Sequence, residues 1–194
     1  MRRELILKVA HDKFSEKGYH ASFSEIANAS GIKKQTLYNY FENKDALFLE
    51  MILIETQAYF EMREHELIRD SNLSAKEQLN NIYMSVIHYF SERRKVTFWR
   101  WMVLIEDIEL MNEVRRITIG PEKQFSEHLQ EIFEEGINSN DIKELPVQSL
   151  VFTFYSLIHG VIESKLLFDN EAAASSYINS VWSIFWQGIQ KSSL

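Results

Sequence analysis

Apolar residues recur every three or four positions along most of the 194-residue chain. This spacing places them on one face of an α-helix, whereas a half-buried strand would alternate apolar and polar residues. No segment shows such alternation over any length, and no repeat or low-complexity tract interrupts the pattern. The pattern therefore predicts an all-α protein.

Residues that start and stop helices divide this pattern into separate elements. Ser22 with Glu25, and Ser74 with Glu77, have the spacing of a capping box, in which each side chain binds the other residue's free backbone N–H. Gly18 follows the first helical segment, where glycine is the usual terminator. The predicted helices cover 3–17, 22–31, 33–41 and 44–68, then one opening at 74, one over 96–110, one from 121 to about 137, and two over 146–167 and 172–191.

Residues 26–41 have the character of a helix-turn-helix. Two short predicted helices flank a tight turn containing Gly31, and the small Ala27 lets them approach closely. Apolar residues of this segment are expected to pack inward. The side chains left on the other faces are types that reach base edges and phosphates: Lys33, Lys34, Gln35, Thr36, Tyr38, Asn39 and Tyr40.

Lys33 and Lys34 open the third predicted helix, where two cations oppose the helix dipole. Bound phosphates would reverse this penalty, and local rules are broken most often where function requires it. The alternative interpretation is that both lysines are simply solvated. We favour the role in DNA binding.

The predicted fold is an N-terminal three-helix helix-turn-helix head, joined by a long fourth helix to a C-terminal helical bundle, with about nine helices in total. The head covers 1–47 and the body covers 48–194. Because the fourth helix spans this boundary, no flexible linker is expected.

The net charge of −7 is unevenly distributed. Residues 1–50 hold eight Lys/Arg and seven Asp/Glu, a net charge of +1, whereas residues 51–194 hold thirteen and twenty-one, a net charge of −8. A local basic patch is what DNA binding requires, so the acidic total does not exclude it.

The composition also bears on the compartment. The chain contains no cysteine, which excludes disulfides and thiolate metal sites and fits a reducing compartment. No long apolar run follows the charged residues 2–4, so a signal peptide is not expected. The longest apolar stretch, 98–105, contains Arg100 and is too short to span a membrane. We expect a soluble cytoplasmic protein with no membrane contact.

The head resembles the TetR family of bacterial transcriptional regulators. The resemblance spans about 35 residues and is carried by Phe14-x3-Gly18-Tyr19, Ile26-Ala27, Gly31-Ile32, Leu37-Tyr38-x-Tyr40-Phe41 and Lys44-x2-Leu47. It implies a homodimer whose head binds an operator, and whose body binds an effector that weakens this binding. It also implies that Tyr38 and Tyr40 touch the DNA backbone, that Lys44 contacts a phosphate, and that Thr36 contacts a phosphate or a thymine methyl group.

The base-reading candidates come from side-chain chemistry and from position on the third helix. Gln35 and Asn39 can each bond adenine bidentately, and Lys34 can bond guanine. Two heads about 34–36 Å apart would read a palindrome in successive major grooves of duplex DNA.

The body offers an aromatic cluster as a candidate effector site. Residues 96–110 are apolar nearly all round, which suggests a central, largely buried helix. An effector cavity would be lined by Tyr83, Ile87, Trp99, Arg100, Trp101, Phe125, Phe154, Tyr155 and His159. The alternative is that these residues only fill the core. Arg100 would suit an anionic effector, whereas the tryptophans and the excess of acid would suit a cationic one.

The last two predicted helices have apolar faces that are too wide for one partner surface. The TetR resemblance implies that they pair with their two-fold mates in a four-helix dimer interface. The candidate interface residues are Phe154, Leu157, Ile158, Val161, Tyr177, Val181, Trp182 and Phe185. The alternative is that both faces belong to the internal core.

These observations favour a dimeric, ligand-responsive regulator of transcription, and we expect a repressor that an unknown small molecule releases from a palindromic operator. The alternative is a DNA-binding adaptor whose body binds another protein. We expect no enzymatic activity, cofactor or metal, because the sequence contains no Gly-rich phosphate loop, nucleophile motif or zinc-ligand spacing. The sequence does not identify the operator, the effector or the regulated genes.

Overall fold

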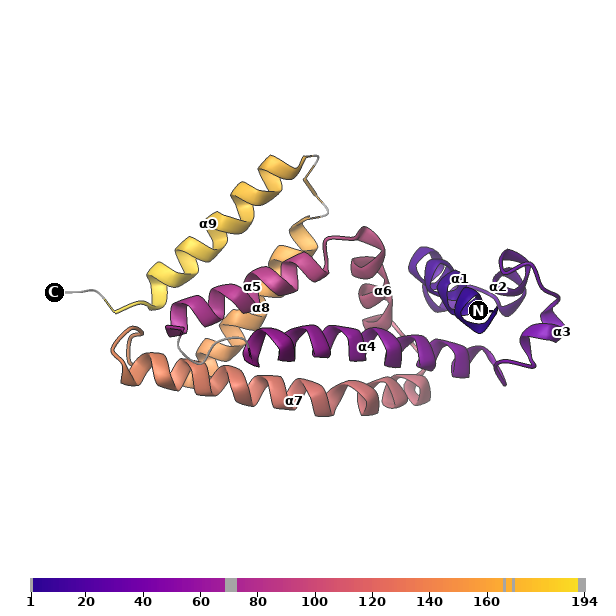
Figure 1. The fold of residues 1–194 in the computed structure, drawn as a ribbon, viewed down its shortest axis with the longest axis horizontal. Helices are drawn as coiled ribbons and strands as arrows, with labels where there is room; N and C mark the ends of the chain where they lie inside the picture. Colours follow the sequence, from indigo (N-terminus) through magenta and orange to yellow (C-terminus); the bar gives the residue numbers. More distant parts are fainter. Residues whose placement is uncertain (1, 69–72, 166, 169, 192–194) are drawn as a thin grey trace. The chain divides into compact units, whose positions relative to one another are not determined.

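The computed structural model describes residues 2–68, 73–165, 167–168 and 170–191. In these residues the chain forms nine α-helices and one 3-10 turn, with no named strand, so the all-α prediction is confirmed (Figure 1). The elements are α1 (Arg2–Lys17), η1 (Gly18–His20), α2 (Phe23–Ala29), α3 (Lys34–Leu37), α4 (Lys44–Ile68), α5 (Ala75–Tyr89), α6 (Arg93–Val103), α7 (Ile108–Asn138), α8 (Val147–Lys165) and α9 (Glu171–Ile189). None of these described helices is both long enough and apolar enough to cross a membrane.

The chain divides into two compact units. Unit 1 consists of Met1–Phe60 and Glu92–Gly120, and unit 2 of Glu61–Ser91 and Pro121–Leu194. The division falls inside α4 and α7, so each of these helices contributes to both units. The predicted boundary between residues 47 and 48 separates the DNA-binding part from the effector-binding part, whereas these units are defined by packing. That boundary stays a prediction.

Several predicted helix starts are confirmed by their hydrogen bonds. The Ser74 side chain accepts from the backbone N–H of Glu77 at 3.4 Å, and the Glu77 carboxylate accepts from the backbone N–H of Ser74 at 2.9 Å. The Asn43 side chain accepts from the N–H of Ala46 at 2.8 Å and begins α4. These local pairs use backbone groups that would otherwise have no partner at a helix start.

The helix predicted to open at Pro121 opens thirteen residues earlier. The carboxylate of Asp107 accepts from the backbone N–H of Leu110 at 2.8 Å and caps α7, which then runs from Ile108 through Pro121 to Asn138. A proline inside a helix removes only one backbone donor, and tertiary packing can compensate for this loss. The prediction that Pro121 marks a first turn was therefore wrong.

The helix predicted over 96–110 is shorter and less buried than expected. Val96, Phe98 and Met102 of α6 are buried, but Val103 and Leu104 are 66% and 57% exposed. The helix ends at Val103. Residues 96–102 are buried or half-buried, so the exposed apolar residues lie only at the C-terminal end of this stretch.

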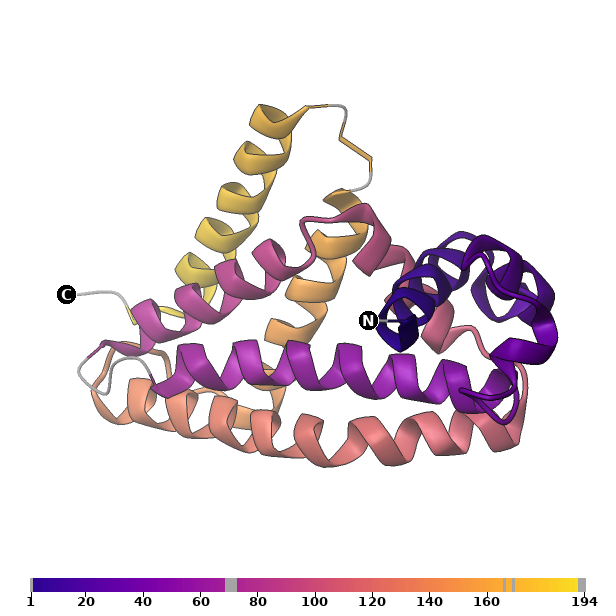
Figure 2. The same ribbon diagram turned by 45° about the vertical axis from the view of Figure 1, so that its right-hand side comes forward.

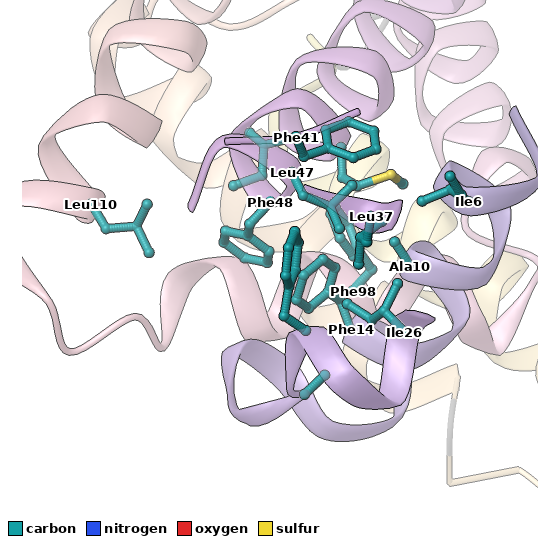
Figure 3. Packing of buried hydrophobic residues seen from close by; sticks show 14 of the residues in the cluster. Ile6, Ala10, Phe14, Ile26, Leu37, Phe41, Leu47, Phe48, Phe98 and Leu110 are labelled. Carbon is teal, nitrogen blue, oxygen red and sulfur yellow. The ribbon is translucent and has the colours of Figure 1, made fainter. Parts of the chain in front are cut away.

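Three phenylalanine rings form the centre of unit 1 (Figure 3). Phe14 of α1 lies edge-on to Phe48 of α4, with ring centroids 4.8 Å apart, and Phe98 of α6 lies 6.2 Å from Phe48. Ile26 of α2 and Leu37 of α3 are fully buried in the same cluster. This core therefore joins α6 to the helices of the predicted head.

A second contact ties α6 to α1. The Arg94 guanidinium donates to the Asp12 carboxylate at 2.7 Å. Farther along α6, the ring of Trp101 covers Gly18, so closely that a Cβ on Gly18 would lie 2.6 Å from ring atoms. Gly18 also has a φ of +59°, a conformation that side-chain-bearing residues rarely adopt.

Unit 2 contains the C-terminal end of α4, α5, the second part of α7, α8 and α9 (Figure 2). Tyr83 of α5 is fully buried, and its hydroxyl donates to the carbonyl oxygen of Ile178 at 2.9 Å. The ring of Tyr83 also stacks on Trp182, with centroids 5.4 Å apart. These contacts fasten α9 to α5.

The two left-handed glycines of unit 1 allow a matched test of the Trp101 contact. Gly31 has a φ of +67° but open space around it, so Gly31→Ala should cost about 1–2 kcal/mol of backbone strain. Gly18→Ala should cost at least about 1 kcal/mol more, because the new methyl group meets the Trp101 ring. Urea unfolding followed by circular dichroism at one fixed protein concentration measures both losses. Equal losses would contradict a close contact between Gly18 and Trp101.

Candidate nucleic-acid interface

The capping box at Ser22 sets the start of α2. Ser22 accepts from the backbone N–H of Glu25 at 3.1 Å, and the Glu25 carboxylate accepts from the N–H of Ser22 at 2.8 Å. The Lys17 ammonium also donates to Glu25. The bond from Lys17, followed by those from Ser22, lowers the pKa of Glu25 to about 2. The negative charge of Glu25 is thus stabilised by the Lys17 cation and by the N-terminus of α2.

The turn after α2 is built around Gly31. The backbone N–H of Ile32 donates to the carbonyl of Ala27 at 3.0 Å, and that of Gly31 donates to Asn28 at 3.1 Å. This pair of bonds is the Schellman arrangement, which requires a left-handed residue at the position of Gly31. The turn fixes the direction in which the chain enters α3.

Residues 33–41, hereafter the recognition segment, contain less α-helix than predicted. Only Lys34–Leu37 are α-helical, and the backbone N–H groups of Asn39 and Tyr40 bond to carbonyls three residues earlier. Such bonds tighten the chain into a 3-10 turn. The reason lies in composition, because threonine, asparagine and aromatic residues are poor helix formers and several of them occur here.

The recognition segment keeps its polar side chains outside the core. Lys33, Lys34, Gln35 and Asn39 are exposed, Thr36 is half-buried, and the apolar Leu37 and Phe41 are buried. Lys33 occupies the N-cap position and makes no side-chain capping bond, as expected of a lysine. The predicted base-reading candidates therefore lie together on an accessible surface of unit 1.

The two predicted backbone-contacting tyrosines are held by the core. The Tyr38 ring lies edge-on to Phe23 of α2, with centroids 4.9 Å apart, and 49% of the residue is exposed. Tyr40 is half-buried and packs against the unit 1 core. Each tyrosine thus has a supported ring, the arrangement that suits a side chain with an apolar body and a polar tip.

Lys44 begins α4 and lies against Tyr19. Its ammonium nitrogen donates to the Tyr19 carbonyl oxygen at 2.7 Å and lies 3.7 Å from the centroid of the Tyr19 ring. Lys44 is half-buried, and this burial lowers the pKa of its ammonium despite the opposing effect of Asp45. Tyr19 thus holds in place the cation that is predicted to contact a phosphate.

Carboxylates neutralise several cations near the recognition segment but not those on it. Lys13 pairs with Glu16, Lys17 with Glu25, and Arg3 with Glu50. In the part of the chain that the structure describes, Lys33 and Lys34 have no ion-pair partner. The uncompensated positive charge of this surface is therefore concentrated where the recognition segment begins.

Comparison with known proteins agrees with this geometry. Residues 6–51 match the sequence model of the family described as bacterial regulatory proteins, tetR family. The fatty acid metabolism regulator protein of Bacillus subtilis (strain 168) is 25% identical over 187 residues, which cover 95% of this chain and 93% of that protein. The resemblance of the head to the TetR family is therefore confirmed over residues 6–51.

Solved structures of TetR-family regulators share the fold of the whole chain. The ketosteroid transcriptional regulator KstR2 of Mycobacterium tuberculosis has a TM-score of 0.77 at 18% identity, covering 99% of this chain and 96% of that one. The transcriptional regulator FadR of Bacillus subtilis, solved in complex with stearoyl-CoA, has a TM-score of 0.72 at 24% identity, covering 96% and 98%. The TetR fold therefore extends beyond the residues that carry the sequence motif.

The candidate effector residues fall into both units. Trp99, Arg100 and Trp101 are half-buried in unit 1, where Trp101 packs on Gly18. The other six lie in unit 2: Tyr83, Ile87, Phe125 and Phe154 are buried, Tyr155 is half-buried and His159 is exposed. Among these six, the structure brings Phe125, Tyr155 and His159 into one row, with centroid distances of 6.1 and 6.5 Å.

Arg63, which is not among the predicted effector residues, joins this row. Its side chain is only 2% exposed, and its guanidinium carbon lies 3.1 Å from the centroid of the Phe125 ring. One guanidinium nitrogen lies 3.3 Å from the Glu122 carboxylate. No sequence signal marked it, because an arginine in a long amphipathic helix is expected to be exposed.

The candidate dimer residues lie mainly inside unit 2. Phe154, Ile158, Val161 and Phe185 are buried within the protomer, and Leu157, Tyr177, Val181 and Trp182 are half-buried. A different set is exposed, which we call the outer stripes: Phe152, Ser156 and Gly160 on α8, and Ser176, Ser180 and Ile184 on α9. Each outer stripe has a spacing of four residues and carries no charge, so each helix keeps a smooth accessible face.

Proposed function

We propose that this protein is a dimeric, ligand-responsive transcriptional repressor that binds a palindromic operator and acts in the cytoplasm, where bacterial DNA lies. The observation that carries the proposal is the exposed recognition segment, whose lysines are not neutralised by carboxylates and whose backbone is fixed to the unit 1 core. A rigid element with accessible Lys, Gln and Asn side chains is what reading a major groove requires.

The roles of individual residues follow from their positions. Lys33 and the tyrosines contact the sugar–phosphate backbone and set the register, and Thr36 contacts a phosphate or a thymine methyl group. Lys34, Gln35 and Asn39 read base edges, because they are exposed and carry donors that match guanine or adenine. Phosphate contacts supply affinity, whereas base contacts supply specificity.

This division of roles predicts different effects for two substitutions. The operator is first obtained by selecting bound duplexes from random DNA, and dissociation constants are then measured by fluorescence anisotropy between 50 and 200 mM KCl. Lys33→Met should make the plot of log association constant against log [salt] less steep by about 2 for a dimer. Each lost phosphate contact removes about 0.9 from the magnitude of this slope, and a dimer loses two contacts. Gln35→Ala should instead weaken binding to the selected operator by about 1–3 kcal/mol. It should also reduce the base preference at one position of each operator half-site.

Lys123→Met is the matched control for Lys33→Met, because Lys123 is an exposed lysine of unit 2 and its loss changes the net charge equally. It should leave the slope almost unchanged. The same reduction in both variants would mean that only total charge matters, which contradicts the proposed phosphate contact.

The outer stripes support dimerisation through α8 and α9. Phe152 and Ile184 are 62% and 69% exposed, although both are large and apolar. A Cβ on Gly160 would meet no atom of the described chain, so packing within the protomer does not require this glycine. Small residues beside large apolar ones allow two helix pairs to approach closely about a two-fold axis.

Phe152→Lys together with Ile184→Lys should therefore disrupt the dimer. Burying an unpaired charge costs about 3–5 kcal/mol, so the dimer dissociation constant should rise by at least about 100-fold. Sedimentation equilibrium at micromolar concentration measures this change. Met84→Lys, at an exposed apolar position on α5, is the control and should leave the dimer intact. A double variant that remains dimeric would exclude the outer stripes as the interface.

The row of Arg63, Phe125, Tyr155 and His159 supports an effector that combines an apolar part with a negative charge. Arg63 contributes a buried cation, and the aromatic rings contribute an apolar surface. The names of similar proteins agree with this, because one match is a regulator of fatty acid metabolism and one solved structure is a complex with stearoyl-CoA. Coupling such an effector to DNA binding needs about 1–3 kcal/mol of difference between the two states.

Stearoyl-CoA is the first effector to test. It should weaken operator binding by about 5- to 150-fold in the anisotropy assay. Arg63→Met should reduce this response while leaving operator affinity without effector unchanged, and Arg63→Lys, which keeps the charge, should retain part of it. If neither stearoyl-CoA nor other acyl compounds change operator affinity, and a co-purifying protein does, the protein is a DNA-binding adaptor instead.

A further inference from the structure

The contacts of Lys44 differ from those of an ordinary surface lysine. Its ammonium nitrogen is 2.7 Å from the Tyr19 carbonyl oxygen and 3.7 Å from the centroid of the Tyr19 ring. Two groups of one residue therefore hold the cation at the start of α4. A free lysine would instead sample many rotamers, and their loss would oppose binding of any anion.

Tyr19 is itself fixed from two further directions. Its ring lies edge-on to Phe48, with centroids 5.2 Å apart, and Phe48 is only 1% exposed in the unit 1 core. Its hydroxyl donates to the carboxylate of Asp45, the residue that follows Lys44. The position of the ammonium is thus determined by the core through the ring of Tyr19.

An ammonium group held in this way still has binding capacity. It carries three N–H donors. One donates to the Tyr19 carbonyl oxygen, and a second lies toward the Tyr19 ring. A remaining donor can bond a phosphate oxygen. Burial lowers the pKa of Lys44, so the cation is partly desolvated before any anion arrives, and less water must be removed on binding.

We infer that Tyr19 is a positioning residue for DNA binding, whose carbonyl oxygen and ring hold the Lys44 ammonium ready for a backbone phosphate. The inference rests on the proposed function, because it assumes that the head binds an operator. It assigns to Tyr19 a role beyond filling space in the turn η1, which follows α1. It also explains why a half-buried cation lies at a helix N-terminus, where the dipole opposes it until a phosphate is bound.

Four variants test the inference: Lys44→Met, Tyr19→Leu, Tyr19→Phe and the double variant Tyr19→Leu/Lys44→Met. The measured quantity is the salt slope of operator binding from 50 to 200 mM KCl, which counts phosphate contacts and does not follow stability. Lys44→Met should lower the slope by about 2 for a dimer. Tyr19→Leu, which removes the ring, should lower it by a similar amount, and Tyr19→Phe, which keeps the ring and the carbonyl, should restore it.

The double variant should show no further loss beyond Lys44→Met, because Tyr19 is proposed to act through Lys44. Independent additive losses, or a Tyr19→Leu variant with weaker binding and an unchanged slope, would reduce Tyr19 to a structural role and overturn the inference. If Lys44→Met itself leaves the slope unchanged while Lys33→Met lowers it, the Lys44 phosphate contact is wrong although operator binding stands.

A measurement on the unaltered protein covers the case in which Tyr19→Leu does not fold. In protein labelled with 13C at the lysine ε-carbon, the Lys44 resonance, assigned by its loss in Lys44→Met, should be shifted upfield by the Tyr19 ring. The shift should persist when the operator is bound. A bound-state resonance at the position of exposed lysines would overturn the inference.

Discussion

The meeting of Phe14, Phe48 and Phe98 is the contact on which unit 1 depends. Each ring belongs to a different helix, and the three helices come from distant parts of the chain. The recognition segment needs this core because it contains only four α-helical residues, far fewer than an isolated helix needs to persist in water. Its conformation therefore depends on tertiary packing through Leu37 and Ile26. The packing of these buried residues also determines where the exposed side chains of the segment lie.

Contacts between aromatic residues connect the buried core of unit 1 to side chains on its surface. Phe48 supports Tyr19, which holds Lys44, and Phe23 supports Tyr38. In each case the inner ring is a buried phenylalanine and the outer ring a tyrosine, which can keep its hydroxyl among polar groups. Rigid side chains with two rotatable bonds can fix a neighbouring group at lower entropic cost than long flexible ones.

The sequence predicts those features that depend on neighbours along the chain. The capping boxes at Ser22 and Ser74 and the turn at Gly31 were found because all partners lie within a few residues. The errors concern distant partners. Phe98 joins a core whose other rings lie fifty or more positions earlier, and Arg63 packs against Phe125, which lies more than sixty positions later. Pro121 looked like a boundary because proline is a strong local signal, yet capping by Asp107 and packing outweighed it.

The distribution of charge shows how an acidic protein can suit DNA. Lysines at 13 and 17 carry carboxylate partners, whereas the described chain provides none for Lys33 and Lys34, so the local field is set by which cations are neutralised. The remaining sequence, with a net charge of −8 over residues 51–194, repels phosphates and disfavours encounters in other orientations. A protein with a near-neutral head and an acidic body is therefore attracted to DNA less strongly, without regard to sequence, than a basic protein would be. In return, attraction is favoured at the surface that carries the base-reading side chains, and each phosphate contact made there adds about 0.9 to the salt dependence of affinity.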